Sequence, residues 1–124
     1  MEAATKNLPE DSRAWFLRGY GHRILGSWPA AEDHLTQALN KRRIDDEQVA
    51  ATYLHRSRVR FEMAKDIGDD LKACSKLPGA ADDFKSMFEL HRYVRNLSEV
   101  NTLREDLTKV TQKRCKQILD LPKP

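Results

Sequence analysis

Residues 15–38 read WFLRGYGHRILGSWPAAEDHLTQA, and this stretch decides the fold class. Its first half has apolar residues at helical spacing, until Gly26-Ser27 interrupts the pattern. Pro29 then fits the first turn of a second helix, where its missing N–H leaves no hydrogen bond unmade. The second half carries small and large apolar residues on one stripe: Ala31, Leu35, Ala38 and Leu39. The stretch therefore predicts two helices joined by a tight turn.

Helical periodicity continues through the rest of the chain. We expect a third helix from Glu47 to Lys65, a short fourth helix over 69–77 and a fifth over 80–97. Pro78-Gly79 predicts the break between the fourth and fifth helices. Ser98 predicts the N-cap of a sixth helix, which reaches Ile118 before the Leu-Pro-Lys-Pro tail. The prediction is one all-α domain over residues 1–124, with six helices in three antiparallel pairs, stacked as a right-handed solenoid or bundled compactly.

Seven residues of the deciding stretch stand at fixed offsets: Trp15, Gly19, Gly26, Trp28, Ala31, Leu35 and Ala38. In this order they resemble the tetratricopeptide repeat, a helix–turn–helix unit of about 34 residues. Gly19 and Ala31 would be the points where the two helices cross most closely, and Trp15, Trp28 and Leu35 would fill the core between them. Arg18 and His22 depart from the residues usual in the family.

The resemblance divides the chain into three units. Residues 9–40 match well, residues 45–77 form a degenerate second repeat, and residues 80–119 keep only helical periodicity. Pro9 falls where the family places the proline that closes a preceding repeat. The chain is therefore interpreted either as a segment of a longer array or as a domain with a rudimentary first helix.

The family resemblance implies a concave groove, lined by the first helix of each pair, that holds a partner peptide or helix. The matching positions here are Arg13, Phe16, Leu17, Tyr20, Arg23, Leu54, His55 and Arg58. Tyrosine and arginine are enriched at binding hot spots, and arginine can hold a carboxylate with two hydrogen bonds. We therefore expect an adaptor, scaffold or assembly factor whose protein partner is acidic and apolar. Co-chaperone repeats hold a chaperone's C-terminal carboxylate with Lys and Asn on these helix faces. The matching positions here are Phe16, Tyr20 and His55, so this kind of binding is disfavoured.

Composition sets broad limits on the class of protein. The 124 residues are 40% hydrophobic and 33% charged, with a net charge of +3, which is typical of a globular protein. The N-terminus lacks the apolar segment of a signal peptide, and no stretch has the length of a membrane-spanning helix. Cys74 and Cys115 are interpreted as free thiols in a reducing compartment. These features favour a soluble, cytoplasmic protein, with the nucleus as the alternative.

No catalytic or metal-binding pattern stands out in the sequence. The four histidines fall on different predicted helices, and the two cysteines lack zinc-ligand spacing. Asp69-Asp70 and Asp82-Asp83 are interpreted as acidic helix N-termini, which the helix dipole favours. We therefore expect no enzyme activity, no cofactor and no metal.

The C-terminal helix offers an alternative function. Its basic residues are Arg104, Lys109, Lys113, Arg114 and Lys116. They could contact nucleic acid or an acidic protein, but a solvated face of a capping helix is the favoured interpretation. A further alternative is that the chain serves as a structural segment of a larger repeat protein.

Overall fold

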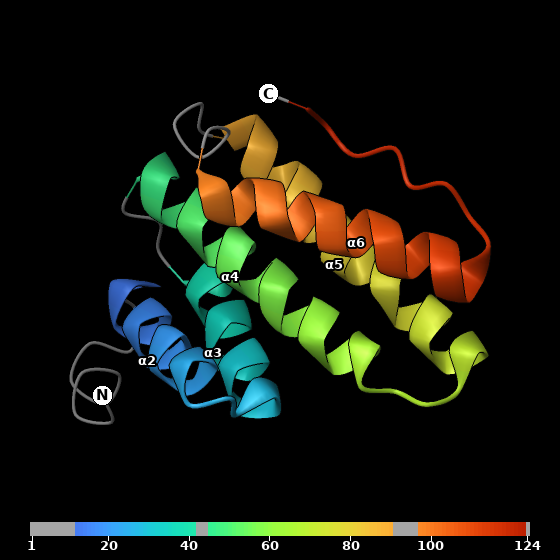
Figure 1. Ribbon diagram of the computed structural model, residues 1–124. Coiled ribbons are helices and arrows are strands. Elements are labelled where there is room, and N and C mark those ends of the chain that lie inside the picture. The colour runs from blue at the N-terminus through green and yellow to red at the C-terminus, as the bar shows by residue number, and fades with distance from the viewer. Residues whose placement is uncertain (1–11, 42–44, 91–96, 124) are drawn as a thin grey trace.

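The computed structural model describes residues 12–41, 45–90 and 97–123, and every regular element in these ranges is an α-helix (Figure 1). The helices are α2 (Ser12–Ile24), α3 (Trp28–Asn40), α4 (Asp46–Lys65), α5 (Asp70–Leu90) and α6 (Ser98–Cys115). The all-α prediction is therefore confirmed. The repeat-closing role expected of Pro9, and the end of the expected fifth helix at residues 91–96, lie outside the described residues.

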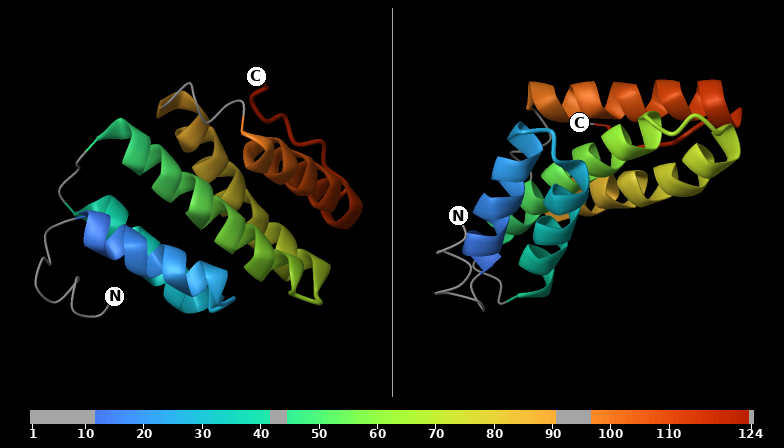
Figure 2. Two further views of the ribbon diagram at one scale, coloured as in Figure 1. Left: turned by 60° about the vertical axis from the view of Figure 1, so that its left-hand side comes forward. Right: turned by 90° about the horizontal axis from the view of Figure 1, so that it is seen from below.

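Helix α4 is the centre of the molecule, because it contacts each of the other four helices. The most extensive interfaces join α2 to α3 and α4 to α5, so each of these pairs is a helical hairpin. Helix α6 packs on α5 and α4, and the C-terminal segment returns along it from the far end (Figures 1 and 2). Because α2 and α6 both reach α4, residues from three separate helices can meet on one side of the molecule.

The expected break at Pro78-Gly79 is wrong, because α5 runs unbroken from Asp70 to Leu90. Proline inside a helix removes one backbone hydrogen bond, but packing on both sides of Pro78 offsets this loss. Leu77, Ala80 and Phe84 are buried, and the Ser57 hydroxyl of α4 donates a 2.7 Å hydrogen bond to the Ala80 carbonyl. The fourth and fifth expected helices are thus one helix.

Helix ends agree with the sequence in part. Asp45 caps α4 through a 2.7 Å hydrogen bond from the Gln48 amide, and Asp69 accepts hydrogen bonds from the first amides of α5. The expected N-cap at Ser98 is one residue late, because the hydrogen bonds of α6 begin at the Leu97 carbonyl. The last helix also ends earlier than expected, at Cys115, and Ile118 lies beyond it with 90% of its surface exposed.

The close crossing expected at Gly19 is confirmed. A Cβ atom built on Gly19 would lie 2.7 Å from Cγ and 3.1 Å from the backbone nitrogen of Leu35. Real Cβ atoms do not approach so closely, so only glycine allows α2 to pack on α3 at this distance. Ala31 and Leu35 are completely buried beside it. Gly26, at φ +75°, makes the turn between the two helices in a conformation that favours glycine.

Two apolar clusters lie in the interior of the part of the chain that the structure describes. The larger lies between α4, α5 and α6, and its largest fully buried members are Phe61, Phe84, Met87, Leu103 and Leu107. The smaller, made by Ala31, Leu35 and Val59, joins α3 to α4. Val100, Leu103 and Leu107 of α6 are buried in the larger cluster.

The interpretation of the cysteines as free thiols is wrong, because Cys74 of α5 and Cys115 of α6 form a disulfide. The pair lies 41 positions apart in the sequence, and no feature of that spacing indicates that α5 and α6 bring the two side chains together. Disulfides persist in oxidising environments, so cysteine usage no longer favours a reducing compartment.

Among the described helices, none combines the length and the apolar character that a membrane-spanning segment needs.

Candidate functional site

Four of the expected groove residues converge on one cluster between α2 and α4. The ring centroid of His55 lies 4.8 Å from that of Tyr20 and 5.6 Å from that of Phe16. The Arg23 guanidinium contacts Nδ1 of His55 and also donates to Glu99 of α6 at 2.5 Å. This cluster therefore joins α2, α4 and α6 across the face where the groove is expected.

His55 is neutral in this environment. Burial, followed by the positive charge of Arg23, lowers its pKa from the ordinary 6.5 to about 4, while Glu99 opposes the shift. Because Arg23 is a donor, Nδ1 of His55 is the acceptor and the ring proton belongs on Nε2. The ring thus fills the space between the helices without carrying charge at neutral pH.

The other two expected residues of α4 also have partners within the chain. Leu54 is buried in the larger core. Arg58 donates to Asp106 of α6 at 3.0 Å and to Glu62 at 3.3 Å, and its guanidinium lies over the Phe61 ring. The α4 part of the expected groove is therefore occupied by contacts to α6 and by the core.

The open part of the surface is on α2. Leu17, Tyr20 and Ile24 are 44%, 40% and 66% exposed, and their spacing places them on one stripe of the helix. Arg13, one turn before Leu17, is exposed and donates a long 3.4 Å hydrogen bond to Gln48 of α4. Helix α2 also contains Arg18 and Arg23, and it has no acidic residue. We call Leu17, Tyr20 and Ile24 the α2 stripe.

The five basic residues expected on the C-terminal helix fall into two groups, those that contact other parts of the fold and those that line an open hollow. Arg114 caps the end of α4 by donating to the carbonyls of Ala64, Lys65 and Gly68, and it pairs with Asp70 at 2.8 Å. Arg104 donates to the Pro122 carbonyl and lies over two phenylalanine rings. Lys109, Lys113 and Lys116 line an open hollow beside Ile118. Two of the five side chains are thus used inside the fold.

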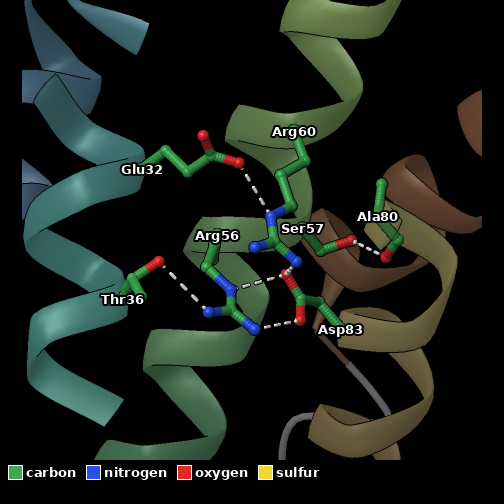
Figure 3. A network of polar contacts seen from close by, with 7 residues as sticks. All are labelled: Glu32, Thr36, Arg56, Ser57, Arg60, Ala80 and Asp83. Atoms are coloured by element: carbon green, nitrogen blue, oxygen red, sulfur yellow. Dashed lines mark hydrogen bonds and ion pairs between the residues drawn. The ribbon is translucent and has the colours of Figure 1, made fainter. Parts of the chain in front are cut away.

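A partly buried polar network between α3, α4 and α5, centred on the buried Asp83, was not expected (Figure 3). Arg56 donates from Nε and Nη2 to both oxygens of Asp83, at 2.8 and 2.7 Å, and Arg60 donates to Asp83 at 3.2 Å. Thr36 and Glu32 of α3 accept from the same two arginines. Asp83 is therefore a buried internal anchor in the middle of α5, and its interpretation as part of a helix N-terminus is wrong.

Two histidines that were placed on separate helices also meet. The rings of His22 and His34 stack with centroids 5.0 Å apart, and His34 also contacts Trp15. In the described part of the chain, no group of three or more His, Cys, Asp or Glu side chains is arranged to hold a metal ion.

No family model, no curated protein and no solved structure matches this chain.

Proposed function

We propose that this chain is a protein–protein interaction module of the tetratricopeptide type, and that it binds its partner along α2. The observation that carries the proposal is the α2 stripe, three neighbouring apolar side chains left exposed on a helix that has no acidic residue. Scattered apolar residues are normal on a protein surface, but a continuous stripe on one helix is typical of a docking surface.

The partner that fits this surface is a helix or peptide with apolar and acidic residues. Apolar side chains at matching spacing would cover Leu17, Tyr20 and Ile24, as in the docking of amphipathic helices. Helix α2 carries three arginines and no acidic residue, which favours acidic segments in the partner, and one of these arginines, Arg23, is already paired with Glu99 of α6. The Tyr20 ring is partly fixed by His55, so it loses little conformational freedom on binding.

Two aspects of the architecture support a repeat-type module. Two helical hairpins follow one another, and Gly19 sits at a helix crossing as the repeat pattern requires. The third expected pair is incomplete, because its first helix is merged into α5 and only its second helix is present separately, as α6. In this proposal α6 is a capping helix that covers the end of the second hairpin.

The test is affinity capture from a cell lysate with the full chain as bait, read by mass spectrometry. Native bait is compared with Ile24→Asp, which places a charge on the α2 stripe, and with Leu71→Asp as the matched control. Leu71 is a similarly exposed aliphatic residue on α5, away from the stripe. We expect the same few proteins with native and Leu71→Asp bait, and their loss with Ile24→Asp.

The nucleic-acid alternative is tested in the same experiment by adding nuclease and high salt. Contacts to phosphates weaken steeply as salt rises, whereas apolar docking does not. Recovery that collapses under either treatment, and that is insensitive to Ile24→Asp, contradicts the proposal and assigns function to Lys109, Lys113 and Lys116.

A further inference from the structure

Residues 117–123 cover a surface of α5 and α6 that includes a small cavity lined by both helices, and we call this surface the α5–α6 groove. Lys116 turns the backbone out of α6 with φ +55°, and residues 117–123 then return along that helix (Figures 1 and 2). Leu121 is almost fully buried and belongs to the larger core, and Leu119 packs against the same cluster. We call residues 117–123 the strap.

Alternate side chains of the strap face the groove. Leu119 and Leu121 are two positions apart and face inward, whereas Ile118 and Asp120 are exposed. This alternation is what an extended segment presents, because successive side chains point in opposite directions. The groove is therefore shaped for an extended peptide with aliphatic residues at positions i and i+2.

Two polar groups of the groove are left without partners by the strap. Within the described residues, the buried side-chain atoms that lack a hydrogen-bond partner are Nη2 of Arg104 and Oγ1 of Thr111, and both belong to α6. Thr111 lines the small cavity beside Leu119, and Arg104 contacts the strap at Pro122. A buried polar group without a partner is costly, so these atoms mark where the strap fits poorly.

The geometry at Arg104 indicates what would fit better. Its Nε donates 2.7 Å to the Pro122 carbonyl, its Nη1 donates to the Asn101 side chain, and Nη2 has no acceptor. Nε and Nη2 form one edge of the guanidinium, the same edge with which Arg56 holds both oxygens of Asp83. A single neutral oxygen thus occupies a position suited to a carboxylate, which accepts two charge-assisted hydrogen bonds.

We propose that the α5–α6 groove is a binding site for an extended acidic peptide, and that the strap occupies it in the free chain. The ligand carries aliphatic residues at i and i+2, which replace Leu119 and Leu121, and it ends at i+3, where its free α-carboxylate takes the place of the Pro122 carbonyl at Arg104. This site shares no residue with the α2 stripe, so it stands or falls independently of the function proposed above.

A ligand must displace the strap, which has the advantage of being tethered. A short flexible tether gives an effective concentration in the millimolar range, so an external peptide binds weakly while the strap is intact. Its apparent affinity scales with the fraction of molecules whose groove is open. Weakening the strap at Leu121 should therefore reveal the site without altering α5 or α6.

The probe is a fluorescent peptide with the sequence of residues 117–122 and a free C-terminal carboxylate, and its partner peptide has the same sequence with a C-terminal amide. Anisotropy titrations compare the native chain with Leu121→Ala. We expect the carboxylate peptide to bind Leu121→Ala about tenfold or more tightly than it binds the native chain. We also expect it to bind Leu121→Ala about fivefold or more tightly than the amide peptide does, because only the free carboxylate supplies two charged acceptors for Arg104.

Arg104→Lys in the Leu121→Ala background keeps the charge but removes the planar edge, so the difference between the two peptides should disappear. If Leu121→Ala fails to fold by circular dichroism, Leu119→Ala replaces it, since Leu119 is only half-buried. The proposal is overturned if the variant with the weakened strap binds neither peptide, if it binds no better than the native chain, or if the carboxylate and amide peptides bind it equally.

Discussion

Gly19 shows how one residue fixes the approach of two helices. Adding a methyl group to a glycine inside a helix normally stabilises it by about 0.5–1 kcal/mol. At Gly19 the new Cβ would collide with Leu35, including its backbone nitrogen. We therefore predict that Gly19→Ala lowers the free energy of unfolding by about 1–3 kcal/mol, measured by urea denaturation.

Gly79 is the matched control for that substitution. It also lies inside a helix, but a Cβ there would meet only the Arg60 side chain, at 3.7 Å. Gly79→Ala should raise the free energy of unfolding by about 0.5–1 kcal/mol. Equal gains at both glycines would contradict the close crossing of α2 and α3.

His55 makes the stability of the chain depend on pH. Its pKa is about 4 in the folded chain against 6.5 ordinarily, so between these values the unfolded chain binds a proton that the folded chain does not. The stabilisation is complete above about pH 6.5 and is lost as the pH falls toward 4. We predict that the free energy of unfolding drops by about 2 kcal/mol from pH 7.5 to pH 5 because of His55 alone.

The measurement compares urea denaturation of the native chain and of His55→Gln at both pH values. Glutamine keeps an acceptor for Arg23 but does not titrate, while His22 and His34 are present in both proteins. The predicted drop should therefore be smaller in His55→Gln by about the stated amount. An equal pH dependence in the two proteins would show that His55 is not held neutral by burial beside Arg23.

Asp83 is a buried carboxylate that pairs with two arginines of α4. Removing one partner of a buried ion pair leaves the other charge uncompensated and typically costs about 3–5 kcal/mol. We predict a loss of this size for Asp83→Asn in thermal or urea denaturation, because Arg56 and Arg60 lose the negative charge that they share. The neighbouring Asp82 is exposed, so Asp82→Asn should change the free energy of unfolding by less than about 0.5 kcal/mol.

Among the helices, local sequence signals predicted starts and stops well where packing agreed with them. Gly26 makes the turn after α2, and Pro29 lies in the first turn of α3, as expected. The helix break predicted at Pro78-Gly79 is absent, because the buried residues on both sides and the ion pairs of Asp83 stabilise α5 as one continuous helix. Propensity is a weak prior that tertiary packing overrides, and that packing is not visible in a window of sequence.

The disulfide fixes α6 against α5 and should contribute measurably to stability. Closing a loop of 41 residues restricts the unfolded chain and corresponds to about 4 kcal/mol in the chain-entropy treatment. We predict that a reductant, or the double substitution of Cys74 and Cys115 by alanine, lowers the free energy of unfolding by about 2–4 kcal/mol. Because both cysteines are in the disulfide, an alkylating reagent should modify neither of them in the native chain under non-reducing, denaturing conditions.

For the whole molecule, the sequence brought together residues that are neighbours in the fold, but it did not show which of them remain exposed. The resemblance to a repeat family brought Phe16, Tyr20, Arg23 and His55 to one face, and the structure places them together. It could not show that α6 supplies Glu99 and Asp106 as partners for Arg23 and Arg58. These contacts link residues that lie far apart in the sequence, and no local pattern indicates them. The α2 stripe is exposed because α4 and α6 do not cover it.

The proposed docking of a partner along α2 can be tested by NMR shift mapping. Isotope-labelled native chain is titrated with a protein recovered in the capture experiment, and amide and methyl shifts are followed residue by residue. We expect the largest changes at Leu17, Tyr20 and Ile24, and no binding when the labelled chain carries Ile24→Asp. Shifts centred on Lys109, Lys113 and Lys116, with α2 unaffected, would contradict it.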